Sequence, residues 1–365
     1  MNLSALNTGL VFESLCISFI ISILTALLAT KLAIRIDLLD RPNSEPHKVH
    51  KRPVPVSGGT AFFLTLIIVL IIFHKHVDAE LWRLTASAFI IYLAALYDDW
   101  KHLNWKFKLA GQIAGTLVLI ITGTRTHLFD SQLFSSWMPE TLCHICDMLL
   151  TMFWIIFLTN AFNLVDSADG VMIGLSAWAE GFLIIAAMDA GQHSLALYCS
   201  ILLGSSLSLS FFNSHPAFLF MGDSGAQVIG FLLSTISIIY TPPELLQKNT
   251  WFLPILLLGV PIFDTTLVTI SRWRKGEHFY HSGTDHTYHR LISIGLSTHQ
   301  ASSFLHLVSF SLQSLAFFAI SQSVIEANLI FAFVFVSGIA AIVFFEKESL
   351  WEPVKKIIQA NEHLS

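Results

Sequence analysis

Eleven apolar stretches, most of them long enough to cross a lipid bilayer, constrain what this chain can fold into. They are residues 11–34, 57–74, 84–97, 107–123, 147–164, 171–190, 194–212, 224–240, 252–271, 301–321 and 327–345. Charged residues make up only 12% of the 365-residue chain, which is about half of their usual share in soluble domains. We therefore expect an all-α, polytopic membrane protein in which residues 1–365 form one domain.

The Lys and Arg residues gather on one side of these predicted spans. With the N-terminus outside the cell, 16 of the 20 basic residues fall in the segments 31–56, 98–108, 272–300 and 346–365. Cytoplasmic loops of membrane proteins carry an excess of Lys and Arg. The pattern predicts eleven spans with a periplasmic N-terminus and a cytoplasmic C-terminus.

The most informative polar stretch covers residues 160–170, where the fifth predicted span ends. Asn160, Asn163 and Asp166 are spaced three apart, so they would share one face if the helix continued through them. Asp169 and Gly170 then break the pattern as a helix end would. Hard oxygen ligands at a membrane surface suit a divalent cation and the phosphates that it carries. A cluster that only caps helix ends is the structural alternative.

Two further clusters fall on the same predicted side. Asp98 and Asp99 end the third span, where one could contact an acceptor group and the other a metal; a solvated charge pair is the alternative. Lys108 could bind a diphosphate as a point charge, or its side chain could only extend to the membrane–water interface. Residues 222–225, Gly-Asp-Ser-Gly, open the eighth span, and a helix N-terminus with glycines favours the close approach of an anion.

The ninth predicted span and the loop after it supply the last group of candidates. Asp264 lies about two turns inside the span, where an ionisable side chain is functional unless Thr265 or a neighbouring helix satisfies it. His286 and His289 could bind a phosphate or a sugar hydroxyl, or could place a proton; a zinc site is a less favoured alternative. Basic residues such as Arg274 also serve topology in such a loop.

The first loop and the cysteines add less. Residues 40–59 combine prolines with basic residues and end in two glycines, which suits a defined loop near anionic headgroups. Cys143 and Cys146 form a lone Cys-x-x-Cys, for which we expect a periplasmic disulfide or unpaired thiols, because a zinc site would need further ligands.

All of the acidic clusters rim one face of the membrane in this arrangement. A transporter would be expected to place its main carboxylates near the bilayer midplane. Their position therefore favours a water-soluble, phosphate-bearing substrate that meets a partner held in the membrane. A transporter or lipid flippase, and a non-catalytic lipid-binding scaffold, are the alternative classes.

Taken together, the motifs between about residues 37 and 300 resemble the polyprenyl-phosphate N-acetylhexosamine-1-phosphate transferases of glycosyltransferase family 4, which include phospho-N-acetylmuramoyl-pentapeptide transferase. Residues 40–43 and 53–59 are closer to the branch that uses UDP-N-acetylglucosamine. The resemblance implies transfer of a sugar-1-phosphate, most closely N-acetylglucosamine-1-phosphate, from a UDP-sugar to undecaprenyl phosphate with release of UMP. Transfer of phospho-N-acetylmuramoyl-pentapeptide or of another sugar-1-phosphate is the alternative.

The resemblance also implies roles for residues in the loops 37–59, 97–108, 160–170, 220–226 and 272–300, which would form a cytoplasmic active site. The resemblance and the motifs together lead us to expect catalysis by Asp98, Asp99 and Asp166, substrate binding by Lys108, Asp169, His286 and His289, and Mg²⁺, or Mn²⁺ in its place, at Asn163 and Asp223. Asn160 and Arg274 are added as substrate-binding candidates from their places in the 160–170 stretch and the 272–290 loop. Two departures concern the identity of the sugar nucleotide: Ser167 stands where Gly is common, and the histidine motif is sparser than usual.

The implied partners are a UDP-sugar, undecaprenyl phosphate and the lipid bilayer, with no nucleic acid and with a homodimer as a possible assembly. The implied place is the bacterial inner membrane, at the start of a lipid-linked cell-envelope glycan. Direct attack of the lipid phosphate is the expected reaction, and a covalent aspartyl-phosphate is the second route.

Overall fold

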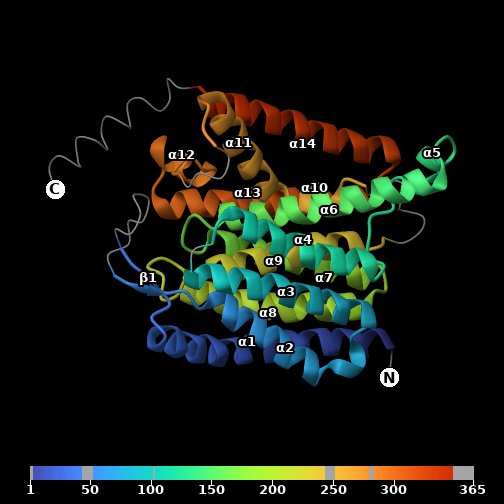
Figure 1. Ribbon diagram of the computed structural model, residues 1–365. Coiled ribbons are helices and arrows are strands. Elements are labelled where there is room, and N and C mark those ends of the chain that lie inside the picture. Colours follow the sequence, from blue (N-terminus) through green and yellow to red (C-terminus); the bar gives the residue numbers. More distant parts are fainter. Residues whose placement is uncertain (1–2, 43–51, 102, 243–250, 279–282, 348–365) are drawn as a thin grey trace.

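The computed structural model describes residues 3–42, 52–101, 103–242, 251–278 and 283–347. Long helices packed side by side make up almost all of it (Figure 1). The helices are α1 (Leu3–Arg35), α2 (Gly58–Ile72), α3 (Ala79–Lys101), α4 (Trp105–Ile121), α5 (Gln132–Ser135), α6 (Glu140–Val165), α7 (Val171–Asp189), α8 (His193–Asn213), α9 (Gly222–Ile239), α10 (Leu253–Leu257), α11 (Gly259–Lys275), α12 (Thr287–Ser293), α13 (Thr298–Ile320) and α14 (Val324–Phe345), with a short 3₁₀ turn at His74–His76.

Each of the eleven predicted apolar stretches contains a helix. By length and composition, eight helices in the described part of the chain could cross a membrane: the apolar part of α1, then α3, α6, α7, α8, α9, α13 and α14. The other three stretches hold α2 and α4, which are shorter, and the pair α10 and α11, which is interrupted at Leu258. The chain is therefore a polytopic membrane protein, and eleven spans remain a prediction.

Small polar residues bring α1 and α8 close together. Ser14 lies 2.5 Å from Ser200 and Ser18 lies 2.9 Å from Ser205, in each case measured between the side-chain oxygens. A Cβ on Gly204 would meet the backbone of α1. Small residues let membrane helices approach closely, and their hydroxyls find partners across the contact. This pairing forms one side of the bundle.

The fold is all-helical, as predicted, apart from a small β structure in the first loop. Strand β1 (Leu39–Asp40) pairs antiparallel with β2 (Val54–Pro55), and Val56 forms a parallel bridge with Phe220. The first loop is thereby attached to the segment that precedes α9. Residues 43–51 of that loop, His281 and the tail 348–365 lie outside the described residues.

The two ends of the bundle differ in character. Strand β1 and helix α12 lie at one end, whereas α5 and the first turn of α1 lie at the other (Figure 1). At the α5 end, the fully buried Asp147 carboxylate accepts hydrogen bonds from the backbone N–H groups of Leu128, Phe129 and Asp130, which fixes that loop. All four cysteines are free thiols. The candidate functional residues lie at the β1 end.

Candidate active site

Lys108 joins two carboxylates that are far apart in the sequence. Its ammonium lies 2.5 Å from Asp98 of α3 and 2.5 Å from Asp223 of α9. Helix α4 delivers Lys108 to this place because Asn104 caps its N-terminus and accepts a hydrogen bond from the N–H of Lys106. One cation held between two largely buried carboxylates makes a site that carries net negative charge.

Asp99 has a different environment from its neighbour Asp98. Its two carboxylate oxygens accept hydrogen bonds from the backbone N–H groups of Asp223 (2.8 Å) and Ser224 (3.1 Å). Asp99 therefore occupies the N-terminus of α9, a position that favours negative charge. Gly222 has a φ of +69°, and a Cβ there would meet the Asp99 carboxylate and Val56. The anion that the sequence predicts at this helix terminus is thus a side chain of the protein itself.

A chain of amides supports Asp223 from inside the bundle. The side-chain amide of Asn163 donates to one Asp223 oxygen (3.0 Å), and that of Gln227 donates to the other (3.3 Å). Gln112 then connects Gln227 with Asn160 at 3.0 and 3.2 Å. Buried amides that satisfy one another in this way fix their neighbours' orientation.

Asn160 does not share the environment of Asn163 and Asp166, contrary to the one-face expectation. Its amide donates to Gln112 and to the Ile156 carbonyl, and it is absent from the cavity lining. A three-residue step turns a helix by about 300°, so each further step moves the side chain about 60° around the axis. Helix α6 also ends at Val165, which places Asp166 beyond the last helical turn.

Asp166 and Asp169 lie in the tight connection between α6 and α7. Asp169 accepts from the backbone N–H of Ala217 at 3.3 Å and lies 2.9 Å from the His215 ring. Gly170, with a φ of +76°, begins α7 rather than ending α6. Burial, together with the nearby negative charges of Asp223, Asp169 and Asp99, raises the pKa of Asp166 to about 8.

The histidine segment is attached to a buried acid. His286 Nδ1 lies 2.8 Å from Asp264 of α11, whose other oxygen accepts the N–H of Thr287 at 2.6 Å. Asp264 and His286 are 1% and 5% exposed. Within the described ranges, Asp264 is satisfied by His286 and Thr287, which follow its own helix, and not by Thr265 or another membrane helix. A carboxylate on one ring nitrogen sets the tautomer and the direction of the other.

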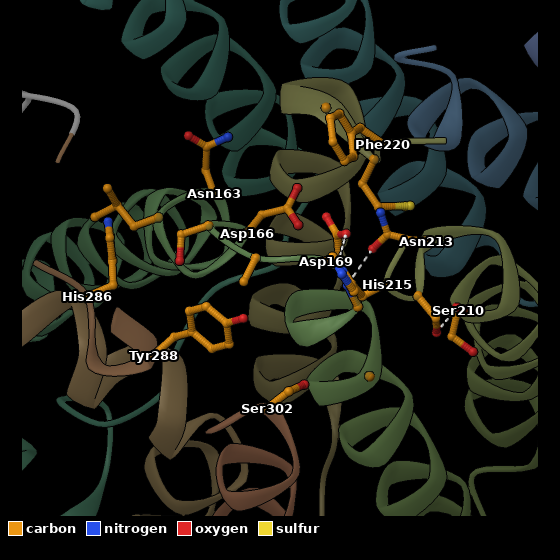
Figure 2. A pocket seen from close by; sticks show the side chains of 18 of the residues that line it. Asn163, Asp166, Asp169, Ser210, Asn213, His215, Phe220, His286, Tyr288 and Ser302 are labelled. Carbon is orange, nitrogen blue, oxygen red and sulfur yellow. Dashed lines mark hydrogen bonds and ion pairs between the residues drawn. The ribbon is translucent and has the colours of Figure 1, made fainter. Parts of the chain in front are cut away.

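One large cavity connects these groups. Its volume is about 2110 Å³, and its lining includes Asp98, Asp99, Lys108, Asn163, Asp166, Asp169, Asp223, His286 and His289. Figure 2 shows Asn163, Asp166, Asp169, His286 and Tyr288 arranged around a common space. Helices α3, α4, α6, α9 and the α12 segment therefore bring their polar ends to one chamber.

Comparison with known proteins supports the family resemblance that the sequence motifs indicate. Residues 81–241 match the model of glycosyl transferase family 4. A Bacillus subtilis protein named as a probable undecaprenyl-phosphate N-acetylglucosaminyl 1-phosphate transferase is 30% identical over 332 residues, which cover 88% of this chain and 87% of that protein. The chain belongs to glycosyl transferase family 4.

Other members of glycosyl transferase family 4 match over similar lengths. Two proteins named undecaprenyl-phosphate alpha-N-acetylglucosaminyl 1-phosphate transferase are 26% identical (Yersinia pestis) and 25% identical (Escherichia coli strain K12). The first match covers 82% of this chain and 80% of the relative, and the second covers 87% and 85%. The similarity thus extends well beyond residues 81–241.

Two of the predicted substrate-binding residues lie away from the chamber. Asn160 belongs to the amide chain described above. The guanidinium of Arg274 lies 2.7 Å from Glu346, and Arg274 is likewise absent from the cavity lining. Arg274 was a candidate because it lies in a basic loop. The direction of its side chain depends on Glu346 at the end of α14, and the sequence of the loop does not show this contact.

Several contributing residues were not among those predicted from the sequence. Gln112 and Gln227 stand singly inside apolar helices. Asn213 accepts from the N–H of Gly170 and donates to the Leu219 carbonyl, so it joins the α6–α7 connection to the segment before α9. A polar residue inside an apolar run was the available signal, because such residues are costly unless they have partners.

The donor atoms of the chamber fit a hard divalent cation. Asp98, Asp223 and Asn163 supply oxygens, and among the residues that the structure describes no cation or hydrogen-bond donor pairs with the Asp166 carboxylate. No three His, Cys, Asp or Glu side chains in the described ranges already form a metal-binding group. Mg²⁺ is commonly held by one or two carboxylates together with substrate phosphates and waters, so this donor set suits an ion that arrives with a diphosphate.

Proposed function

We propose that this protein transfers N-acetylglucosamine-1-phosphate from UDP-N-acetylglucosamine to undecaprenyl phosphate and releases UMP. The observation that carries the proposal is the single chamber in which Lys108, Asp98 and Asp223 meet at 2.5 Å. The names of the relatives from Bacillus subtilis, Yersinia pestis and Escherichia coli supply the sugar and the lipid. Another UDP-sugar, including the muramoyl-pentapeptide precursor, is the alternative donor within the same reaction class.

In this proposal an oxygen of the lipid phosphate attacks the sugar-bearing phosphorus, and the bond from that phosphorus to the UMP oxygen breaks. A phosphate monoester is mostly dianionic at neutral pH, so little proton removal is needed. Asp98 orients the acceptor or takes its residual proton through the oxygen that faces Lys108, since its other oxygen accepts the N–H of Leu103 and both oxygens of Asp99 accept backbone N–H groups. Lys108 counters charge that gathers on the transferring phosphoryl group.

Asn163 and Asp223, with Asp166 beside them, would hold Mg²⁺. When bound, the ion neutralises phosphate charge as in other phosphoryl transfers. Asp169 and the histidine segment would contact the donor at the opposite side of the chamber from the acceptor. The two anionic substrates repel each other, so Lys108 and the metal ion should contribute strongly to bringing them together.

The proposed membrane arrangement has eleven spans with the chamber facing the cytoplasm of a bacterial inner membrane. It is supported by the one-sided distribution of Lys and Arg and by the common end of the bundle at which the motifs meet. Undecaprenyl phosphate would enter from the bilayer and UDP-sugar from the cytosol. A homodimer stays a prediction.

A panel of radiolabelled UDP-sugars tests the function. Purified protein is mixed with undecaprenyl phosphate and each donor, and labelled lipid and UMP are measured. Label from UDP-N-acetylglucosamine should enter the lipid with one UMP released per sugar. Transfer only from another donor would replace the proposed substrate, and lipid movement in vesicles without UMP release would favour a flippase. Asp223→Ala should abolish transfer, and the exposed Glu13→Gln is the matched control.

A further inference from the structure

The α12 segment, which carries His286 and His289 into the chamber, is short and is held by contacts from other elements. Its first turn is fixed by Asp264, as described above. Just before it, Asp285 accepts two hydrogen bonds from the buried Arg272 of α11, at 3.0 and 2.9 Å. A seven-residue helix has little stability of its own, so such contacts decide where it lies.

The third attachment comes from the far end of the chain. Arg290, in the last turn of α12, donates from Nη1 to the Phe345 carbonyl and to Glu346 Oε1, both at 2.8 Å. Its Nε donates to the Asp285 carbonyl at 2.8 Å. Arg290 is only 7% exposed. A buried guanidinium needs such acceptors, because an unpaired buried charge is strongly unfavourable.

Glu346 accepts hydrogen bonds from two arginines, Arg290 of α12 and Arg274 of α11. Its second oxygen accepts from Arg274 of α11 at 2.7 Å. Burial would raise the pKa of Glu346, but its hydrogen bonds with Arg290 and Ser271 and the nearby positive charges hold the pKa below the ordinary value. Glu346 is therefore an anion at neutral pH and links the end of α14 to both α11 and α12.

We propose that Glu346 is a positioning residue that locks Arg290, and through it the α12 histidines, in the orientation that binds the UDP-sugar. The inference rests on the proposed function. We call the contacts of Glu346 with Arg290 and Arg274 the latch, so Arg274 belongs to the latch and does not bind the UDP-sugar donor. Helix α12 packs against α11 and α13. Among the described residues, Glu346 and Arg290 do not belong to the lining of the chamber that holds Lys108, Asp98 and Asp223, so the reacting groups should keep their places when the contact between Glu346 and Arg290 is lost.

Glu346→Gln and Arg290→Lys test the latch in the purified full-length protein. Each removes a charge or a fork-shaped donor while keeping the size of the side chain. The KM for UDP-N-acetylglucosamine should rise about tenfold, the KM for undecaprenyl phosphate should stay within about twofold, and kcat should fall by less than about threefold. Glu346→Asp should recover part of the donor affinity.

Glu326→Gln is the matched control. Glu326 lies in the first turn of the same helix, α14, where its carboxylate forms a capping box with Ser323. Loss of this cap destabilises α14 from its other end, so it reports what simple loosening of the helix does. If Glu326→Gln raised the donor KM as much as Glu346→Gln, or if Glu346→Gln lowered kcat with an unchanged donor KM, the positioning role would be refuted.

Hydrogen–deuterium exchange separates the latch from the proposed function. Amides of residues 287–293 should exchange at least about fivefold faster in Glu346→Gln than in wild type, with no such change in Glu326→Gln. If the wild-type protein transferred no sugar from any donor, the proposed function would be refuted. The exchange rates of α12 would still show whether Glu346 holds this helix in place. Unchanged exchange in α12 would refute the latch whatever the donor.

Discussion

The Asp99 carboxylate accepts the backbone N–H of Asp223 at 2.8 Å, and the adjacent Asp98 shares the ammonium of Lys108 with the side chain of that same Asp223. Asp98 faces the ammonium of Lys108, whereas Asp99 caps helix α9. Two identical side chains next to each other in the sequence thus have separate roles, because successive residues on a helix point about 100° apart.

Replacing the two aspartates should therefore give different results. Asp99→Asn removes one of two acceptors at the start of α9 and should lower the free energy of unfolding by about 1 kcal/mol, together with activity. Asp98→Asn should lower kcat by at least about 100-fold with a smaller change in stability. Thermal unfolding followed by Trp fluorescence and steady-state transfer assays measure both. Equal effects of the two variants on stability would contradict the assignment.

Lys108 should be essential for turnover. Lys108→Met leaves the carboxylates of Asp98 and Asp223 without their shared cation, and we expect kcat to fall by more than about 100-fold. Lys106→Met is the control, because Lys106 lies on the same helix over the Trp105 ring, 5.8 Å from its centroid. A transfer rate within about threefold of wild type in Lys108→Met would remove Lys108 from the site.

Asp264 should act through His286. In Asp264→Asn the amide oxygen cannot serve both the ring and the N–H of Thr287 as two carboxylate oxygens do. We expect the donor KM to rise about tenfold, with a smaller effect on the lipid KM. Thr265→Val is the adjacent control, since the buried Thr265 hydroxyl has no hydrogen-bond partner in the described part of the chain. Similar KM values in both variants would contradict the role of Asp264.

Asp166 should make metal binding depend on pH. Its pKa is about 8 in the folded protein and near 4 when unfolded, so in EDTA the unfolded state binds fewer protons between those values. Stability in EDTA should consequently fall as pH rises from 5 to 8, because ∂ΔG/∂pH is negative there. Mg²⁺ favours the ionised form, so its stabilising effect should grow over the same range.

Thermal unfolding of wild type and Asp166→Asn, with EDTA or Mg²⁺ at each pH, measures this dependence. The variant keeps the size of the side chain but cannot ionise, so its unfolding temperature should vary less with pH and should respond less to Mg²⁺ at pH 8. Ser167→Ala, at the neighbouring position, serves as the control. A wild-type protein whose response to Mg²⁺ is equal at pH 6 and pH 8 would be inconsistent with the raised pKa of Asp166.

The membrane class, the approximate helix positions and most of the chamber could be predicted from the sequence. Apolar stretches define helices in a bilayer, because every backbone polar group must be satisfied within the span. Asp98, Asn163 and Asp223 could be selected because oxygen-bearing side chains gather at the ends of several apolar runs on one predicted side and match family motifs. The end of α6 at Val165 agrees with the predicted end of the fifth span. The interruption at Leu258 was not predicted, because the stretch 252–271 is apolar on both sides of it.

What the sequence determined by itself was which side chains are available and, through the distribution of Lys and Arg, the side of the membrane on which they are expected. What only the tertiary structure decided was how those side chains pair: Asp99 with the start of α9, Asn160 with Gln112, Asp264 with His286, and Arg274 with Glu346. The physical reason is that each pair joins different elements, and the direction of a side chain between packed helices follows from their relative rotation, which no single segment specifies.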